Sequence, residues 1–430
     1  MPTIATQVDL SGASRIFQGF RTVIEEKHWR KRVKQLIEHS KRNEFLRMHY
    51  ASEYELAFQL EACSKLIEKY GTFPPDSIEA QGLMPAVAFM SQVLSLLDGL
   101  QRDKQRAFVG RIRGALRNPG DMRALLMEFT VATHFTLRGN RVRWPELEAN
   151  DTKLQGATFD LFVEDLGNDG VEVECKSVSH DKGRSIHRAT AFAMHERLRM
   201  ELGGFAQRLE NGLAVVVTVP DAVPESHAEQ SELAKRVHRQ LLVGRSEAFN
   251  DGVQIGITDL DASRLRDIEL QTNSDDARAI VDDVTGTRNQ SVLVIGRRNV
   301  GALLLVLQSS KDDGLLSAVF DTARKAARSQ LSGARPGLLL LGFDGLEAEQ
   351  LASLAQQDAD SAQAPTAARI AVSQFLSGDG RDHVVGVGFL SRNRLRRLGT
   401  GHFNSGGVAY YFENEASSLW LPAFKGLFRG

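Results

Sequence analysis

The sequence predicts an α/β (α+β) protein in which a helical N-terminal region precedes a mixed core and a further α/β region. Three observations favour this class. Residues 13–118 carry helical apolar periodicity. A short β-hairpin is expected over residues 158–177, between a helix and a buried strand. From residue 246 onward, apolar strand-like runs alternate with helical segments. We therefore expect three regions, 1–118, 119–245 and 246–430.

Composition limits the classes of function. Hydrophobic content of 42% and charged content of 25% are ordinary for a globular chain, and a formal net charge of −1 means that a nucleic-acid partner must be argued from local charge. The two cysteines, Cys63 and Cys175, are far apart and favour a reducing, cytoplasmic location. The N-terminus lacks the pattern of a secretory signal. The longest apolar runs are too short to cross a bilayer, so we expect no membrane partner.

Basic residues concentrate in the helical N-terminal region. Residues 21–50 contain nine Lys and Arg against four Glu, with Trp29, Phe45 and Tyr50 interleaved. This pattern is consistent with a phosphate-binding face. It is somewhat more typical of a solvated helix face, and both interpretations stay open. Residues 102–123 form a second basic segment.

The segment RNPGD predicts the start of a helix over residues 122–137, with Gly139 as its stop. Its apolar residues recur with helical spacing, and Glu128 falls on or beside this buried stripe. A carboxylate at that position is either a boundary residue or directed at a site, and the helix alone does not decide between them.

The hairpin at residues 158–177 consists of two alternating runs, TFDLFVED and VEVECKS, joined by LGNDG. Because side chains alternate between the faces of a strand, one face carries Val171, Val173 and Cys175, and the other carries Glu172, Glu174 and Lys176. The polar face also receives Asp160 from the first strand. Buried carboxylates and an amine are costly unless something uses them. In the alternative, Asp160 and Lys176 form only a surface ion pair, which contributes at most about 1 kcal/mol.

After Lys176 a loop leads into a basic helix, and the apolar run at residues 213–220 predicts a buried strand. The expected order is then helix, strand, strand, strand, helix, strand. This order resembles the PD-(D/E)XK nuclease superfamily, which has the restriction-endonuclease-like αβββαβ fold. The resemblance covers residues 121–220 and is carried by Glu128 in the helix, Asp160 in TFDLF, and Glu174-Cys175-Lys176 as the E-x-K element. Phe159 stands where the proline of the motif's name would be.

The resemblance implies a site for Mg²⁺ or Mn²⁺. Asp160, Glu174 and the backbone carbonyl of Cys175 would be metal ligands, since hard divalent cations prefer oxygen. Lys176 would contact the attacking water or the scissile phosphate. Glu128 would bind a second metal ion or a metal-bound water. Bases after the E-x-K strand would hold nucleic-acid phosphates, and the candidates are Lys182, Arg184 and Arg188.

We accordingly expect a metal-dependent phosphodiesterase, an endonuclease rather than an exonuclease, acting on DNA in genome defence, restriction or repair. The alternative is a catalytically silent module on the same fold that binds nucleic acid or protein. A homo-oligomer stays open. Residues 246–430 either extend the core sheet or form a separate domain, and we interpret the acidic residues at 259–283 as solvated loop.

Overall fold

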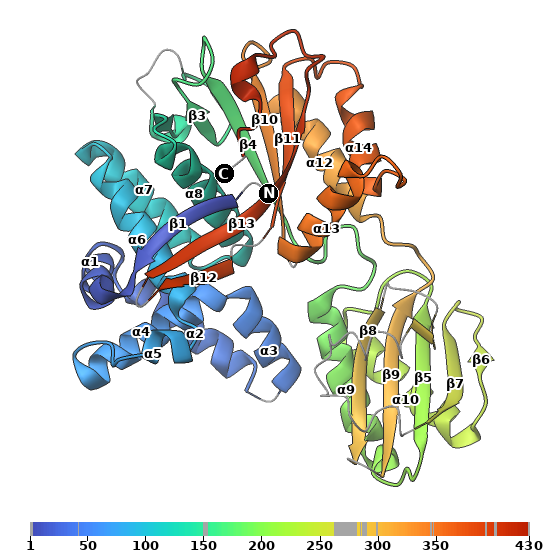
Figure 1. The fold of residues 1–430 in the computed structure, drawn as a ribbon. Coiled ribbons are helices and arrows are strands. Elements are labelled where there is room, and N and C mark those ends of the chain that lie inside the picture. Colours follow the sequence, from blue (N-terminus) through green and yellow to red (C-terminus); the bar gives the residue numbers. More distant parts are fainter. Residues whose placement is uncertain are drawn as a thin grey trace. The chain divides into compact units, whose positions relative to one another are not determined.

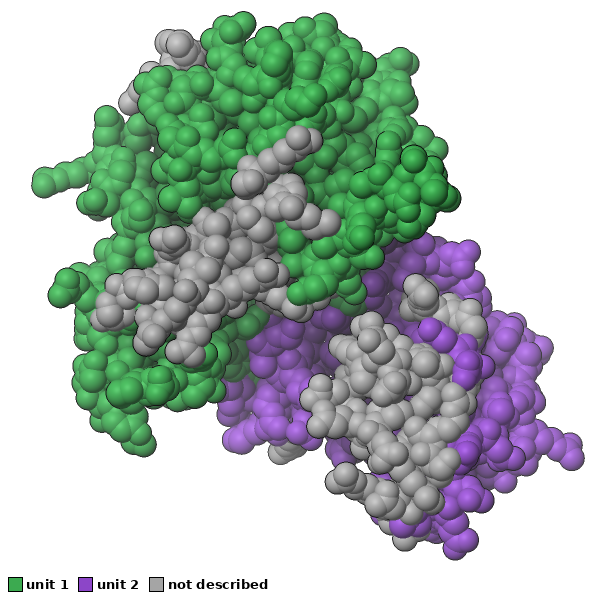
Figure 2. Space-filling model, in the orientation of Figure 1, with its two compact units in different colours: residues 1–36, 53–182, 316–430 green, residues 37–52, 183–315 purple. Residues whose placement is uncertain are grey.

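The computed structural model describes residues 3–41, 43–148, 154–261, 282–283, 285, 290–297, 300–344, 346, 348–391, 394–399 and 402–428. The chain forms two compact units (Figure 2). The first unit comprises Met1–Leu36, Glu53–Lys182 and Leu316–Gly430, and the second comprises Ile37–Ser52 and Gly183–Leu315. Both units are mixed α/β, as the sequence predicts at this level.

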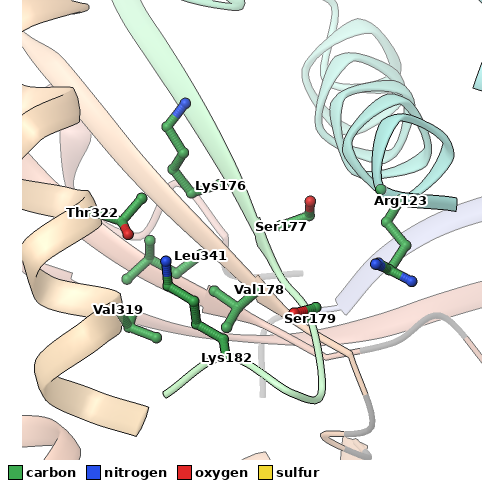
Figure 3. A pocket seen from close by; sticks show the side chains of 10 residues that line it. Arg123, Lys176, Ser177, Val178, Ser179, Lys182, Val319, Thr322 and Leu341 are labelled. Carbon is green, nitrogen blue, oxygen red and sulfur yellow. The ribbon is translucent and has the colours of Figure 1, made fainter. Parts of the chain in front are cut away.

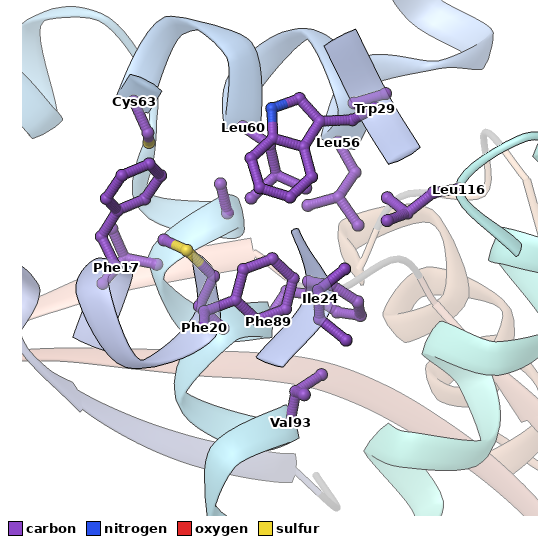
Figure 4. Packing of buried hydrophobic residues seen from close by; sticks show 14 of the residues in the cluster. Phe17, Phe20, Ile24, Trp29, Leu56, Leu60, Cys63, Phe89, Val93 and Leu116 are labelled. Carbon is purple, nitrogen blue, oxygen red and sulfur yellow. The ribbon is translucent and has the colours of Figure 1, made fainter. Parts of the chain in front are cut away.

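The N-terminal part of the chain is helical, as expected, apart from a strand, β1 (Thr3–Asp9), that the sequence analysis missed. The helices are α1 (Ala13–Ile24), α2 (Lys27–His39), α3 (Glu44–Glu53), α4 (Glu55–Tyr70), α5 (Ser77–Ala80), α6 (Met84–Asp98), α7 (Arg102–Ala115) and α8 (Pro119–Leu137). Large apolar side chains from several of these helices pack into one cluster that includes Phe17, Phe20, Trp29 and Phe89 (Figure 4). Burial of these large aromatic side chains stabilises this part of the chain.

The large sheet of the first unit has the strand order β1-β13-β11-β10-β4-β3-β2, with β12 also paired to β13 (Figure 1). Its strands are β2 (Val142–Arg143), β3 (Leu161–Val163), β4 (Val171–Val178), β10 (Gly337–Phe343), β11 (Val384–Leu390), β12 (Arg394–Gly399) and β13 (His402–Glu413). The helices α13 (Ala348–Ala359) and α14 (Ala367–Leu376) lie between β10 and β11 in the chain. The C-terminal region therefore extends the sheet of the hairpin through β10, β11 and β13.

The predicted hairpin is confirmed. β3 and β4 are antiparallel, with Leu161 opposite Val173 and Val163 opposite Val171. All four side chains are buried in one cluster with residues of α8. In the turn, Gly170 has φ 79°, and a Cβ there would lie 2.3 Å from the ring of Phe162, so the tight reversal requires glycine.

The helix and strand that were expected to complete the core after the hairpin lie in the second unit. α9 (Arg188–Ala206) and β5 (Gly212–Val219) exist as elements, but β5 pairs with β7 and β9 in the second unit's sheet. Strand β4 instead pairs in parallel with β10, and α12 (Leu315–Ser329) precedes β10 in the chain. The expected core boundary of 119–245 is thus interrupted after Lys182. Pattern alone could not show this, because β5 and β10 are both short apolar runs with no local mark of their partners.

The second unit has a five-stranded sheet in the order β6-β7-β5-β9-β8. Its further elements are α10 (His227–Val243), β6 (Glu247–Ala248), β7 (Gln254–Leu260), β8 (Gln290–Arg297) and β9 (Gly301–Ser309). Helices α9 and α10 pack on one face through a shared apolar cluster. Of the acidic residues expected in a loop, Asp259 lies exposed on β7, whereas Asp275 and Asp276 lie outside the described residues.

The chain's last described segment returns to the first unit. Phe424 and Phe428 are fully buried in the cluster under the large sheet, and Leu427 accepts a hydrogen bond on its carbonyl from Nε2 of His134 at 2.9 Å. None of the described helices combines the length and apolar character needed to span a membrane.

Candidate functional site

Asp160 lies where β3 begins, one residue before Leu161. Its Oδ2 accepts a hydrogen bond of 2.8 Å from the backbone N–H of Cys175 on β4. If β3 were longer, a backbone carbonyl of β3 would accept the hydrogen bond from this N–H. The carboxylate of Asp160 accepts it instead. The carbonyl of Cys175 points to the same side of β4 as its N–H, because both groups of one residue share a direction in a strand. The structure thus brings Asp160 and the Cys175 backbone together.

Glu174 and Glu172 share a face of β4 and are both 0% exposed, but their surroundings differ. Glu172 accepts hydrogen bonds from the N–H of Ser332 at 2.7 Å and from its hydroxyl at 2.6 Å, with Arg335 at 3.5 Å. Among the described residues, Glu174 has one ion pair, between its Oε1 and Nζ of Lys176, and its Oε2 accepts no hydrogen bond. Glu172 is therefore a structural residue. Glu174 is the carboxylate that still has an oxygen available to bind a ligand.

Glu128 projects from α8 and is 2% exposed. Its Oε1 accepts a hydrogen bond of 2.6 Å from Arg111 on α7, while its Oε2 is buried without a partner. Arg111 also pairs with Glu146 at 2.6 Å. The sequence left open whether Glu128 points inward. In the structure its side chain is buried, and only one of its two oxygens accepts a hydrogen bond from a described residue.

The three carboxylates interact electrostatically. Burial raises the pKa of Glu174 to about 8, and the charge of Asp160 adds to the shift against the opposing effect of Lys176. Burial likewise raises the pKa of Glu128 to about 8, with Asp160 adding and Arg111 opposing. Burial raises the pKa of Asp160 as well, although the hydrogen bond from Cys175 counteracts it. Because the charge of each carboxylate raises the pKa of its neighbours, their protonation is linked.

The donor set suits a hard divalent cation. It consists of carboxylate oxygens and a backbone carbonyl, and two of the carboxylate oxygens, Oε2 of Glu174 and Oε2 of Glu128, are buried without a hydrogen bond from any described residue. Within the described part of the chain, no three His, Cys, Asp or Glu side chains are arranged to hold a metal ion as they stand. Lys176 and Arg111 supply the positive charge next to these carboxylates in the structure.

A cavity of about 310 Å³ opens at the carboxyl end of β4 (Figure 3). It is lined by Gly120, Arg123, Lys176, Ser177, Val178, Ser179, Lys182, Val319, Thr322 and Leu341. Lys176 therefore belongs both to the carboxylate group and to the cavity wall, and Lys182 lies in the cavity as well. The carboxyl ends of parallel strands, here β4 and β10, are the usual position of ligand sites in α/β sheets.

The other two predicted phosphate-binding bases are in the second unit. Arg184 forms an ion pair with Asp313 at 3.9 Å, and Arg188 is the half-buried first residue of α9. They are not brought together with Lys176 inside one unit.

The aromatic side chains of the basic segment 21–50 each contact other side chains of the protein. Trp29 is 0% exposed in the helical core. The ring of Phe45 stacks on Phe192 at 6.4 Å, and the hydroxyl of Tyr50 is 2.8 Å from Nδ1 of His39. Trp29 is therefore not available for stacking on a base, whereas Phe45 and Tyr50 are half-buried, and both interpretations of this segment stay open.

Sequence reasoning missed Arg111, Ser177 and Ser179 as site residues. Arg111 stood in the second basic segment without an assigned role. A usable signal was present, because Arg111 and Glu128 lie at similar distances on either side of the Asn118–Pro119 break. Two helices folding back at that break bring such residues together.

Comparison with protein-family models, with curated proteins and with solved structures finds no match for this chain.

Proposed function

We propose that this protein is a metal-dependent nuclease, an endonuclease that hydrolyses phosphodiester bonds of DNA. The observation that carries the proposal is the group of three interacting carboxyls, the buried Glu128 and Glu174 and the half-buried Asp160, with a single ammonium, that of Lys176, paired with Glu174. Several buried carboxylates with too few cations nearby cost several kcal/mol, and such groups concentrate at functional sites.

The topology supports the proposal. In chain order, α8, β2, β3, β4, α12 and β10 give helix, strand, strand, strand, helix and strand, with neighbouring strands β2-β3-β4-β10. This order and adjacency resemble those expected for a restriction-endonuclease-like core, which is why they support the proposal. The last two elements, α12 and β10, follow the second unit in the sequence.

Mg²⁺ or Mn²⁺ fits this donor set, held by Asp160, Glu174 and the carbonyl of Cys175, with Glu128 reaching it directly or through water. A bound divalent ion would activate the attacking water and neutralise charge on the phosphate. For binding, the ammonium of Lys176 would have to leave Glu174, since both would compete for the same carboxylate oxygens.

The chain's own groups have separate tasks in this proposal. Lys176, released from Glu174, donates to a phosphate oxygen and stabilises the charge that builds on it. Arg111 holds Glu128 in one orientation through its hydrogen bond of 2.6 Å. The N–H of Cys175 fixes the carboxylate of Asp160 on one oxygen and leaves the other available.

The test is cleavage of closed circular plasmid DNA with Mg²⁺ or Mn²⁺, because a closed circle has no end for an exonuclease. We expect Asp160→Asn and Lys176→Met to reduce the rate by at least about 100-fold. Asp169→Asn, in the exposed turn of the same hairpin, is the matched control and should cleave like wild type. Equal cleavage by all four proteins would sink the assignment of this site.

A catalytically silent binding module is the second candidate. The observation in its favour is that Lys176 and Arg111 already pair with Glu174 and Glu128. Such a module would bind DNA equally with EDTA or Mg²⁺, with steep dependence on salt and no turnover. Tighter binding or cleavage on addition of the ion would exclude it.

A further inference from the structure

The cavity beside Lys176 contains donors that the proposed cleavage reaction does not use. They come from the end of β4 and the turn that follows, in which the N–H of Lys182 donates to the carbonyl of Ser179 at 3.1 Å. Figure 3 shows Ser177 and Ser179 between Arg123 on α8 and Lys182, which lies on the side of α12. One short segment thus places two hydroxyls and two ammonium groups along the lining of one cavity at the end of β4.

The charge in this cavity is only partly compensated. Arg123 is held by Glu53 at 2.6 Å and lies 3.7 Å from Asp344, and Lys176 pairs with Glu174. Among the residues that the structure describes, no carboxylate lies within ion-pair distance of Lys182. Lys182 therefore carries the uncompensated positive charge.

The hydroxyl groups differ in what they can offer. Thr322 donates its hydroxyl hydrogen to the carbonyl of Ala318 at 2.9 Å, so it presents only lone pairs to the cavity. The hydroxyls of Ser177 and Ser179 make no hydrogen bond with any described residue and are free to donate. A half-buried cavity with one free ammonium and two free hydroxyls is matched to an anion with several oxygens.

We propose that this cavity binds a terminal phosphate, the phosphomonoester of a nucleic-acid strand end or of a free nucleotide, next to Lys176. A phosphomonoester carries about −1.5 to −2 charges near neutral pH and three free oxygens, which match Lys182, Ser177 and Ser179. An internal phosphodiester has one charge and fewer free oxygens. The choice of a nucleic-acid phosphate rests on the proposed function, whereas phosphate binding itself requires no hydrolysis.

The size and lining of the cavity agree with this ligand. A volume of about 310 Å³ is near the lower limit of ligand pockets and suits one nucleotide, not a double helix. The apolar side chains of Val178, Val319 and Leu341 form a wall on which a sugar or base can lie.

The experiment measures fluorescence anisotropy of a labelled single-stranded ten-nucleotide DNA in EDTA, so that no cleavage occurs. Strands with a phosphate at the 5′ end, at the 3′ end, or at neither end are compared. We expect one phosphorylated strand to bind at least about tenfold more tightly than the hydroxyl-ended strand. Lys182→Gln and the double variant Ser177→Ala/Ser179→Ala should lose this preference. Lys325→Gln, an exposed lysine on α12, is the control and should keep it.

Competition separates the two sources of the phosphate. A nucleoside monophosphate that displaces the phosphorylated strand, when the nucleoside does not, assigns the cavity to nucleotide phosphates in general. Displacement by neither assigns it to strand ends. Displacement by the nucleoside alone, equal affinity for all strands in wild type, or a preference that survives in Lys182→Gln would overturn the proposal. A preference for phosphorylated ends without plasmid cleavage would contradict the proposed nuclease activity and support this phosphate site. Plasmid cleavage without that preference would support the nuclease activity and contradict the phosphate site.

Discussion

Replacing Glu174 with Gln should stabilise the first unit at pH 8 and change its stability little at pH 5. The carboxyl is 0% exposed, and among the described residues its one ion pair is with Lys176. Because its pKa is raised from 4.5 to about 8 in the folded state, folding favours the protonated form. The penalty is absent below the unfolded value, grows as the pH rises from about 4.5 to 8, and is complete above that.

The magnitude follows from the shift. At about 1.36 kcal/mol per pKa unit, a rise from 4.5 to about 8 corresponds to at most about 5 kcal/mol. The effect of Lys176 is already contained in this pKa, but rearrangement and water entry around the charged carboxylate reduce the penalty that the wild type experiences. We therefore expect the variant to exceed wild type by about 2–3 kcal/mol at pH 8, and by less than about 1 kcal/mol at pH 5.

The assay is urea unfolding followed by tryptophan fluorescence at several pH values in EDTA. All three tryptophans, Trp29, Trp144 and Trp420, belong to the first unit, so the signal follows the unit that contains Glu174.

The matched control is Glu172→Gln, which changes an equally buried residue on the same face of β4. It breaks the hydrogen bonds with Ser332 and should lower the free energy of unfolding at pH 8 by about 1–3 kcal/mol. If Glu174→Gln is less stable than wild type by the same margin at pH 5 and pH 8, the reasoning is refuted. Glu174 would then be a satisfied structural residue like Glu172.

Two further predictions use the same unfolding assay. Arg111→Met leaves Glu128 without its cation and should cost about 2–4 kcal/mol at pH 8. The loss should shrink toward pH 5, where a carboxyl with a pKa of about 8 is neutral, and a loss independent of pH would contradict the pairing. Excision of residues 184–313 should leave the first unit folded, because the N–H of Gly314 donates to the carbonyl of Gly183 at 2.8 Å and the two ends can be joined. Loss of the tryptophan signal of the native unit would show that its sheet needs the second unit.

The features that could be predicted from the sequence are local ones. The hairpin, the helix with Glu128 and the helical N-terminal region all follow from periods of 2 and 3.6 residues, which a short window contains. The residue types at Asp160, Glu174 and Lys176 lie in the same window as the hairpin. Their convergence followed from strand alternation, and the register of Leu161 with Val173 agrees with it.

Contacts between distant parts of the chain could not be predicted in this way. β1 is paired with β13, whose residues lie at the far end of the chain, and nothing near Thr3–Asp9 indicates that partner. The difference between Glu172 and Glu174 is of the same kind. It depends on Ser332 and Arg335, which stand in a loop that follows α12 and has no sequence relation to the hairpin.

The place of the second unit in the sequence explains why β5, and not β10, was expected to complete the core sheet. Parallel strands such as β4 and β10 need a crossover connection, and a crossover runs over the surface, where an insertion does not disturb buried pairing. The pairing of Glu172–Val178 with Gly337–Phe343 accordingly runs without a register shift, although the larger segment of the second unit, Gly183–Leu315, stands between the two strands in the sequence. The nearest apolar strand after Lys176 is therefore not its neighbour. Long-range pairing decides between β5 and β10, because β5 already has a strand on each side in its own sheet and offers β4 no free edge.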